Sequence, residues 1–221
     1  VCDFMDDVYT NCRSRGADGF AFVIQAESPV ALGAAGMQLG YGGTRNSVAI
    51  EFDTRYSYEL FDPYENHISV HSRGWRNRNS ANHTYSFGST VAISDLTDGD
   101  HDVRVVYDPV FDEALLSSGD SFTASPHMNQ FMENADWFQG GQADWSTGMG
   151  TLSVYLDDLY SPVLTVPMNF DALINLRNGR AWVGFTAATG DNMYQTHDII
   201  SWSFTQMRKD PTTTNPIVPN N

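Results

Sequence analysis

The chain has 221 residues, of which 41% are hydrophobic, so it can bury a substantial core as one sizeable domain or two small ones. Its formal charge of −15 comes from only 12 basic residues against 27 acidic ones. This balance argues against a nucleic-acid partner or an attraction to anionic lipid, and it favours cations and neutral ligands. No apolar run approaches the roughly 18 to 20 residues that span a bilayer, so no direct membrane insertion is expected.

The first 15 residues form a polar segment that contains both cysteines, Cys2 and Cys12. Two cysteines do not establish a framework, so a local disulfide that closes this loop, which we prefer, and two free thiols both stay open. The chain begins at Val1 rather than Met, which indicates a processed product or an excised piece. Asn82-His83-Thr84 is an N-glycosylation acceptor sequence. Together these features predict a secreted or cell-surface (extracellular) protein.

Short strand-like runs separated by Gly, Pro, Asn and Asp recur along the chain, and no long window shows helical periodicity. This pattern predicts an all-β antiparallel sandwich that spans residues 16–207 as one domain. Residues 113–150 are predicted to be an aromatic-rich insertion with one short helix near residues 128–134. Residues 208–221 have the Pro, Thr and Asn composition of a linker to a following region. The predicted strands are residues 19–26, 47–54, 67–71, 101–107, 151–156, 181–187 and 199–206.

Residues 49–72 carry the strongest chemical signal. Glu51 and Asp53 alternate within an apolar strand, so their side chains share one face about 6–7 Å apart. Asp62 ends an irregular loop and His67 opens the next strand, which can return a carboxylate and an imidazole to the same place. Acids that face a sandwich interior are costly unless they are paired or metal-bound. Three carboxylates and one imidazole suit Mn²⁺, with Ca²⁺ beside it taking oxygen ligands.

Four segments in order resemble the L-type, or legume-type, lectin family: residues 16–22, 48–54, 62–68 and 182–204. The resemblance implies a concanavalin-like antiparallel β-sandwich, or jelly roll, that binds sugars through loops organised by Ca²⁺ and a transition metal. The family has one or two strands before the first segment, so we expect the first strands to be missing from this chain.

The resemblance also implies roles for individual residues. Glu51, Asp53, Asp62 and His67 match the Mn²⁺ ligands, and Asp53 and Asp62 would bridge to Ca²⁺.

On the sugar side, Asp18 follows a cis peptide with Ala17 and would accept hydrogen bonds from two sugar hydroxyls. Gly36 matches the glycine whose backbone N–H donates to the sugar. Asp191 and Asn192 fall in the loop in which the family varies its specificity.

Two positions of the Ca²⁺ loop depart from the family. Arg55 stands where an aromatic residue usually stacks on the sugar, and Ser57 stands where an Asn usually serves both Ca²⁺ and the sugar. The shorter Ser57 hydroxyl would do both jobs less well. With Arg55 and Ser57 in the metal loop, metal binding is expected to be better preserved than sugar binding.

The sequence therefore predicts a metal-dependent, non-catalytic carbohydrate-binding module whose partners are glycans or glycoproteins. The alternative is a structural or adhesive module of an extracellular filament or cell-wall assembly, which contacts copies of itself or other matrix chains with weak or lost sugar binding. An enzyme is not expected, because retaining β-glucanases of this architecture need a carboxylate pair about 5–5.5 Å apart. The run Glu51-Phe52-Asp53 lacks the second glutamate of that arrangement.

The remaining histidines and tryptophans are expected to be structural. No histidine outside the predicted metal site has a partner at metal-ligand spacing, so these side chains are expected to be solvated or at the edge of the core. They are His71, His83, His101 and His127, whereas His197 would fix the turn into the last strand. Trp182 and Trp202 lie in apolar strand patterns and are predicted to belong to the core.

Overall fold

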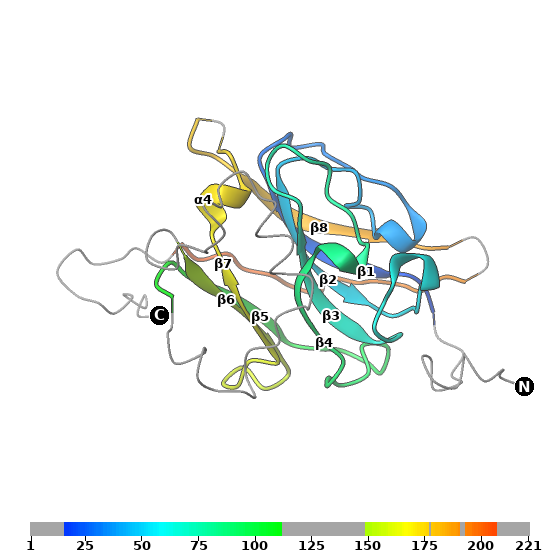
Figure 1. The fold of residues 1–221 in the computed structure, drawn as a ribbon. Helices are drawn as coiled ribbons and strands as arrows, with labels where there is room; N and C mark the ends of the chain where they lie inside the picture. The colour runs from blue at the N-terminus through cyan, green and yellow to red at the C-terminus, as the bar shows by residue number, and fades with distance from the viewer. Residues whose placement is uncertain (1–15, 112–148, 177, 191–192, 207–221) are drawn as a thin grey trace, which may run out of the picture.

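The structure is a computed structural model that describes residues 16–111, 149–176, 178–190 and 193–206. Two antiparallel sheets pack against each other: a five-stranded sheet of order β4-β3-β2-β1-β8 and a three-stranded sheet of order β5-β6-β7 (Figure 1). Within these ranges no helix is long and apolar enough to cross a membrane. The all-β sandwich expected from the sequence is thus confirmed.

The strands are short and joined by loops that contain only brief helical turns. The large sheet contains β1 (Gly19–Gln25), β2 (Ser47–Asp53), β3 (His67–Ser72), β4 (Ser86–Thr90) and β8 (Trp182–Ala188). The small sheet contains β5 (Val103–Asp108), β6 (Gly150–Leu156) and β7 (Leu164–Met168). The helical turns are η1 (Gly36–Gln38), η2 (Tyr58–Leu60), η3 (His83–Tyr85) and α4 (Phe170–Leu173).

The main core lies between the two sheets and is built from alternate strand residues. Ile50 and Phe52 of β2 point into it, and Leu152 and Val166 approach from the small sheet. The rings of Phe20 and Phe52 stack with centroids 4.8 Å apart. Full burial of one such side chain contributes about 1.5–3 kcal/mol, so this layer fixes the register of β2.

The opposite face of the large sheet is also covered. All seven residues of β2 are buried. The side chains that alternate with the core residues pack against loops that carry Leu39, Tyr41, Leu60 and Ala81. With Phe52 directed at the small sheet, the twofold period of a strand turns its neighbours towards these loops. The predicted position of the acids of β2 between the two sheets is therefore wrong: they lie beneath the loop layer.

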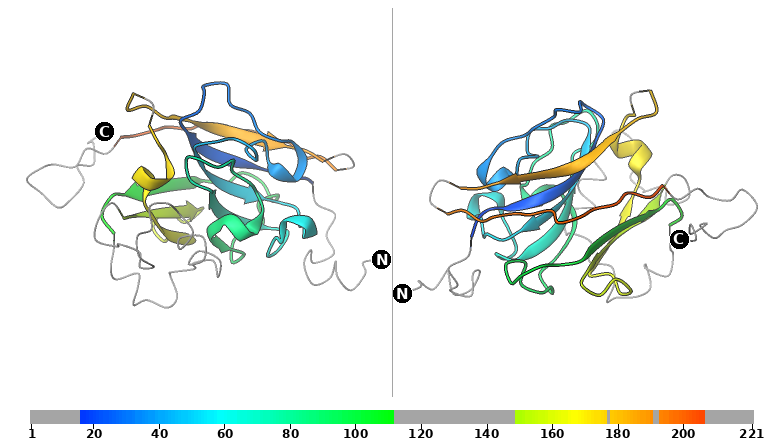
Figure 2. Two further views of the ribbon diagram at one scale, coloured as in Figure 1. Left: turned by 45° about the horizontal axis from the view of Figure 1, so that its top comes forward. Right: turned by 180° about the vertical axis from the view of Figure 1, so that it is seen from behind.

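The strand predictions differ from the structure in three places. Residues 199–206 were predicted to be a strand, but the structure forms no ladder there, and Figure 2 draws this segment as a coil. β1 is already paired on both sides, with β2 and β8, so residues 199–206 cannot pair with it, and they form no ladder with the edge strand β8 either. Trp202 is 53% exposed, so its predicted place in the core is wrong. β4 and β7 were missed because Gly88 and Pro167 interrupt their strand-like patterns.

Several predictions fall outside the described ranges. These are the Cys2–Cys12 pairing, His127, the short helix at residues 128–134, the specificity-loop residues Asp191 and Asn192, and the linker at residues 208–221.

Candidate functional site

The predicted metal ligands meet beneath the loops that cover the large sheet. The register of β2 with β3 sets Asp53 opposite His67 and Glu51 opposite Ser69, all on one face. Glu51, Asp53 and His67 each offer a ligand atom within 4.8 Å of the other two. Their exposed fractions are 1%, 2% and 0%, so water screens their charges poorly.

Asp62 lies in the loop between β2 and β3, close enough for its charge to interact with Asp53, Glu51 and His67. Its Oδ2 accepts a hydrogen bond from the Ser57 backbone N–H at 2.7 Å, which closes the loop around the carboxylate. The Arg55 backbone N–H donates to Asp53 Oδ1 at 2.7 Å in the same way. The loop that carries the two departures from the family, Arg55 and Ser57, is therefore tied by its backbone to two of the predicted ligands.

The electrostatics of this cluster fit a divalent cation. Burial raises the pKa of Asp53 well above its usual range, and the carboxylates of Asp62 and Glu51 raise it further. Burial likewise raises the pKa of Asp62 to about 7. Burial opposes protonation of His67, but Glu51, Asp53 and Asp62 raise its pKa to about 9, so a proton on this ring balances part of their negative charge. A bound cation would take over this role.

The orientation of His67 fits the same interpretation. Its Nδ1–H donates to the Tyr64 backbone carbonyl at 2.8 Å. Its Nε2 is buried without a hydrogen-bond partner and lies 3.4 Å from Glu51 Oε1. A backbone carbonyl on one ring nitrogen is the usual way in which a metal-binding histidine is oriented for coordination through the other. Glu51, Asp53 and His67 therefore form a group that could hold a divalent metal ion.

Asp18 lies at the end of β1, next to this metal loop. The peptide between Ala17 and Asp18 is cis, as the resemblance implied. The backbone of Asp18 is held between β8 and the metal loop: its N–H donates to the Ala188 carbonyl and its carbonyl accepts from the Thr54 N–H, both at 3.0 Å. Since Thr54 directly follows Asp53, the position of Asp18 depends on the metal loop.

Asp18 is 1% exposed, yet only one of its two carboxylate oxygens has a hydrogen-bond partner. Arg55 Nη1 donates to Asp18 Oδ1 at 3.3 Å, whereas Oδ2 is buried without a partner. Burial raises the pKa of Asp18, although the Arg55 guanidinium opposes this shift. Arg55 thus lies against the carboxylate that the resemblance assigns to sugar hydroxyls.

Two glycines lie next to the Asp18 carboxylate. A Cβ added to Gly36, which has φ of +63°, would lie 4.0 Å from Asp18 Oδ2. A Cβ added to Gly190 would lie 2.8 Å from Arg55 Nη1 and 3.3 Å from Asp18 Oδ2. Asp18, Gly36 and Arg55 therefore share one small site, while the contribution of Asp191 and Asn192 stays a prediction.

His71 and His83 were predicted to be solvated or at the edge of the core, and for His71 this is wrong. His71 is fully buried, and its Nε2 lies 2.8 Å from Glu51 Oε1. His83 is partly buried and offers a ligand atom within 4.8 Å of those of Glu51 and His71. The alternation of His67, Ser69 and His71 along β3 is the sequence signal that places His71 on the face of Glu51. His83 had no such signal because it comes from a loop.

Asn82, the predicted glycosylation site, begins the turn η3. Its Oδ1 accepts hydrogen bonds from the Thr84 N–H at 3.0 Å and from the Thr84 hydroxyl at 2.6 Å. Glycosylation of Asn82 stays a prediction.

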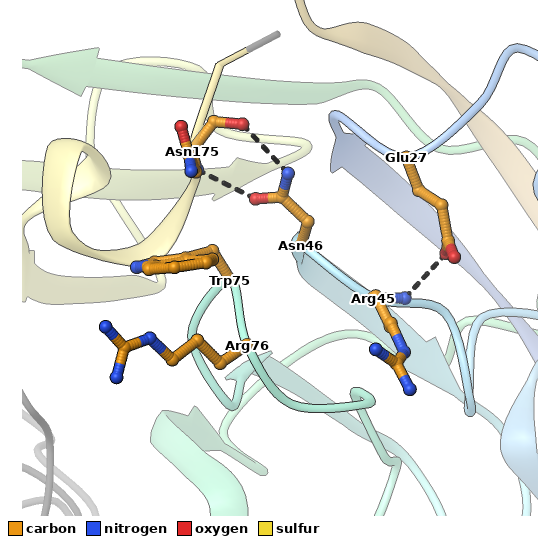
Figure 3. Close-up of a pocket in the computed structure, with 6 residues that line it drawn as sticks. All are labelled: Glu27, Arg45, Asn46, Trp75, Arg76 and Asn175. Carbon is orange, nitrogen blue, oxygen red and sulfur yellow. Dashed lines mark hydrogen bonds between the residues drawn. The ribbon is translucent and has the colours of Figure 1, made fainter.

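A pocket lies at the opposite end of β2 from the metal ligands (Figure 3). This pocket of about 330 Å³ is lined by Glu27, Arg45, Asn46, Trp75, Arg76 and Asn175. Asn46 and Asn175 exchange two hydrogen bonds, of 2.9 and 2.8 Å, and the Arg45 backbone N–H donates to Glu27 at 2.8 Å. We call it the Trp75 pocket.

Fold and site together define an antiparallel β-sandwich with a buried cluster of carboxylates and histidines under one sheet. The legume lectin domain family matches residues 3–118 and 143–219, which is well over half of the chain. The chain belongs to this family.

Two solved structures are similar to the chain. Peanut lectin with a 9mer peptide is 20% identical with a TM-score of 0.44, and the match covers 78% of this chain and 56% of that chain. Basic winged bean lectin with Tn-antigen is 22% identical with a TM-score of 0.45, and the match covers 81% of this chain and 56% of that chain. This chain thus spans about 56% of the length of each of these lectins.

Proposed function

We propose that this domain is a non-catalytic carbohydrate-binding module whose sugar site depends on Ca²⁺ and Mn²⁺. Family membership supports carbohydrate binding, and it favours this function over a purely structural or adhesive role. The observation that carries the proposal is the Asp18 carboxylate, which is buried beside the metal loop with Oδ2 free to accept a hydrogen bond. A buried acceptor without a partner is costly unless a ligand supplies the donor.

In this proposal Asp18 and Gly36 bind the sugar directly. Asp18 Oδ2 accepts from a sugar hydroxyl, and the Gly36 backbone N–H donates to a sugar oxygen. Bound Ca²⁺ and Mn²⁺ would neutralise the carboxylates of Glu51, Asp53 and Asp62 and hold their loops in place. The hydrogen bond from the Thr54 backbone N–H to the Asp18 carbonyl connects these loops to the sugar site, so the metals would also fix the position of Asp18.

Arg55 limits the strength of this site. Its guanidinium occupies one Asp18 oxygen, so a sugar must share the carboxylate or displace the guanidinium. The stacking surface of the usual aromatic residue is also missing at this position. We expect an affinity of about 0.1–1 mM for one monosaccharide, because a site without the stacking aromatic residue buries little of the sugar's surface. Several copies acting on one glycan would raise the effective affinity.

We further propose that the protein acts outside the cell, either secreted or at the cell surface, with glycans or glycoproteins as partners. The sequon at Asn82 and the two cysteines support this setting. Contacts with copies of itself or with other extracellular matrix or filament chains remain compatible with this function.

The test is calorimetric titration of the full chain, saturated with Ca²⁺ and Mn²⁺, with mannose, glucose and galactose. We expect heat from at least one sugar, and its loss in Asp18→Ala. Asp158→Ala is the matched control, because Asp158 is a fully exposed carboxylate that lies outside the site. Sugar binding that survives Asp18→Ala, or no sugar binding by the metal-loaded protein, would contradict the proposal.

A further inference from the structure

Glu51 of β2 lies between two histidines of the neighbouring strand β3, and only one of these histidines belongs to the metal site described above. In the register of β2 with β3, Glu51 faces Ser69, while His67 and His71 lie two positions away in opposite directions. Glu51 Oε1 is 3.4 Å from His67 Nε2 and 2.8 Å from His71 Nε2. A second group of possible ligands therefore extends from Glu51 towards His71.

His71 is oriented as a metal-binding histidine is. Its Nδ1 lies 3.1 Å from the Ser80 backbone carbonyl, which can only accept, so Nδ1 carries the proton and donates. Nε2 then lies 2.8 Å from Glu51 Oε1 and 2.8 Å from the hydroxyl of Ser69, which also donates to Glu51 Oε1. The ring is fully buried, so no water is available to replace a lost partner. The Nδ1 contact repeats that of His67, whose Nδ1 faces the Tyr64 carbonyl, although Nε2 of His67 has no hydrogen-bond partner.

His83 completes the group from the loop layer. The turn η3 begins at Asn82, and the His83 ring lies edge-on to two others, with centroids 5.9 Å from His67 and 6.0 Å from His71. One nitrogen each of His71 and His83 and one oxygen of Glu51 lie within 4.8 Å of one another. Two ligands about 2.0–2.2 Å from one ion are at most about 4.4 Å apart, so these side chains need only a small adjustment to share an ion.

We propose that Glu51, His71 and His83 form a second transition-metal site, which shares only Glu51 with the Ca²⁺ and Mn²⁺ ligands. Two imidazoles and one carboxylate suit Zn²⁺ or a similar ion, whereas Ca²⁺ requires oxygen ligands. Three protein ligands leave a coordination position for water. His67 and His71 face the same oxygen, Glu51 Oε1, so this oxygen would bridge the two ions through its separate lone pairs. Tyr41 donates to Glu51 Oε2 at 2.7 Å and helps to hold this shared carboxylate.

The contrasting interpretation is a structural cluster, in which His71 and Glu51 form a buried hydrogen-bonded pair and His83 bonds the Ser89 hydroxyl at 3.2 Å beside them. Both interpretations account for the 2.8 Å contact between His71 and Glu51. They differ in metal stoichiometry, because only a metal site takes up an ion in addition to those at Asp53, Asp62 and His67.

The test counts metal ions on the full chain. The protein is stripped with EDTA, saturated with Ca²⁺ and Mn²⁺, dialysed against Zn²⁺, and analysed for all three elements by mass spectrometry. We expect one equivalent of Zn²⁺ with no loss of Mn²⁺, and loss of that equivalent in His83→Gln. His83 is only partly buried, so this variant is expected to fold, whereas His71→Gln removes a fully buried ring. His101→Gln is the control, because His101 pairs with Asp157 away from the cluster.

Cobalt provides a second measurement. Co²⁺ added in place of Zn²⁺ should give a visible absorption spectrum of a low-coordinate nitrogen and oxygen site, and His83→Gln should abolish it. Zn²⁺ that only displaces Mn²⁺, an unchanged Zn²⁺ count in His83→Gln, or no uptake at all would overturn the proposal. Because neither readout depends on sugar, the outcome is separate from that of the Asp18 titration.

Discussion

The two ends of β2 differ in how their polar groups are satisfied. At the end near Asn46, the Trp75 pocket is open, and its polar groups bind one another through the two bonds between Asn46 and Asn175. At the other end, Glu51 and Asp53 lie buried with other carboxylates, and His67 Nε2 lacks a partner. The polar groups of the Trp75 pocket thus have most of their hydrogen bonds within the protein, whereas those at the Asp53 end do not.

This contrast teaches that shape alone does not identify the site. A pocket whose hydrogen bonds are already made gains little from a polar ligand. A buried group of like charges, by contrast, gains a great deal from a cation. The predictions that follow test whether metal and sugar binding belong to the Asp53 end alone.

The largest effect is expected from Asp53→Ala. Asp53 is a ligand candidate, and the residue after it holds the Asp18 backbone, so the variant should lose metal and sugar binding together. It should also lose the stabilisation by bound metal, about 2.7 kcal/mol at a metal concentration of 100 times Kd. Calorimetry and thermal unfolding with and without metal measure both effects. Glu27→Ala in the Trp75 pocket is the control, and an equal loss there would break the comparison.

Arg55→Trp should strengthen sugar binding. The change frees Asp18 Oδ1 and supplies an aromatic face at the position where the family usually has one. We expect affinity to rise about tenfold, which corresponds to about 1.4 kcal/mol. Calorimetry with the best of the three monosaccharides measures the change. Arg76→Trp beside Trp75 should leave that affinity unchanged, and weaker binding in Arg55→Trp would show that Arg55 itself contacts the sugar.

Trp75→Ala should have a smaller effect, confined to stability. Trp75 is 39% exposed, and the Arg76 guanidinium lies 4.6 Å from its ring centroid. An exposed contact of this kind contributes about 0.5–1 kcal/mol. Denaturant unfolding should show a loss of about that size, with metal and sugar titrations unchanged. A large fall in sugar affinity would instead assign ligand binding to the Trp75 pocket.

The smallest effect is expected at Asp157, outside both ends of β2. Burial raises the pKa of Asp157, but hydrogen bonds from Ser94 and His101 outweigh this effect and hold the pKa below 3.8. A lowered pKa in the folded state stabilises the fold above the unfolded pKa, and this contribution disappears as the pH falls through the folded value.

Asp157→Asn should therefore lower stability at neutral pH by less than about 1 kcal/mol, as is usual for exposed pairs. Thermal unfolding of both proteins at pH 6 and at acidic pH tests this, with Asp158→Asn as the control. The difference between wild type and Asp157→Asn should vanish at low pH, and a difference that grows on acidification would contradict the assignment.

Local patterns predicted most of the fold. The alternation in residues 47–54 and 67–71 gave β2 and β3 nearly to the residue, and the four motifs in order indicated the family. One feature was not predictable in this way. Whether residues 199–206 form a strand depends on which strands they could pair with, and β1 is already paired on both sides, which no local pattern reports.

In the candidate site, too, the contacts that follow from local patterns were predictable and the contacts between distant segments were not. Glu51, Asp53 and His67 could be placed together because strand period and loop spacing bring them onto one face. The pairing of Arg55 with Asp18 and the approach of His83 to Glu51 are contacts between distant segments. They depend on how the loops cover the sheet, so only the folded chain reveals them.

The central claim is that the buried cluster at the Asp53 end organises Asp18 for sugar binding. The most direct measurement is sugar affinity by calorimetry on one protein sample, taken metal-loaded, after EDTA stripping, and after Ca²⁺ and Mn²⁺ are restored. The account predicts that sugar heat disappears on stripping and returns with the metals. Sugar binding that is unchanged in the stripped protein would contradict it.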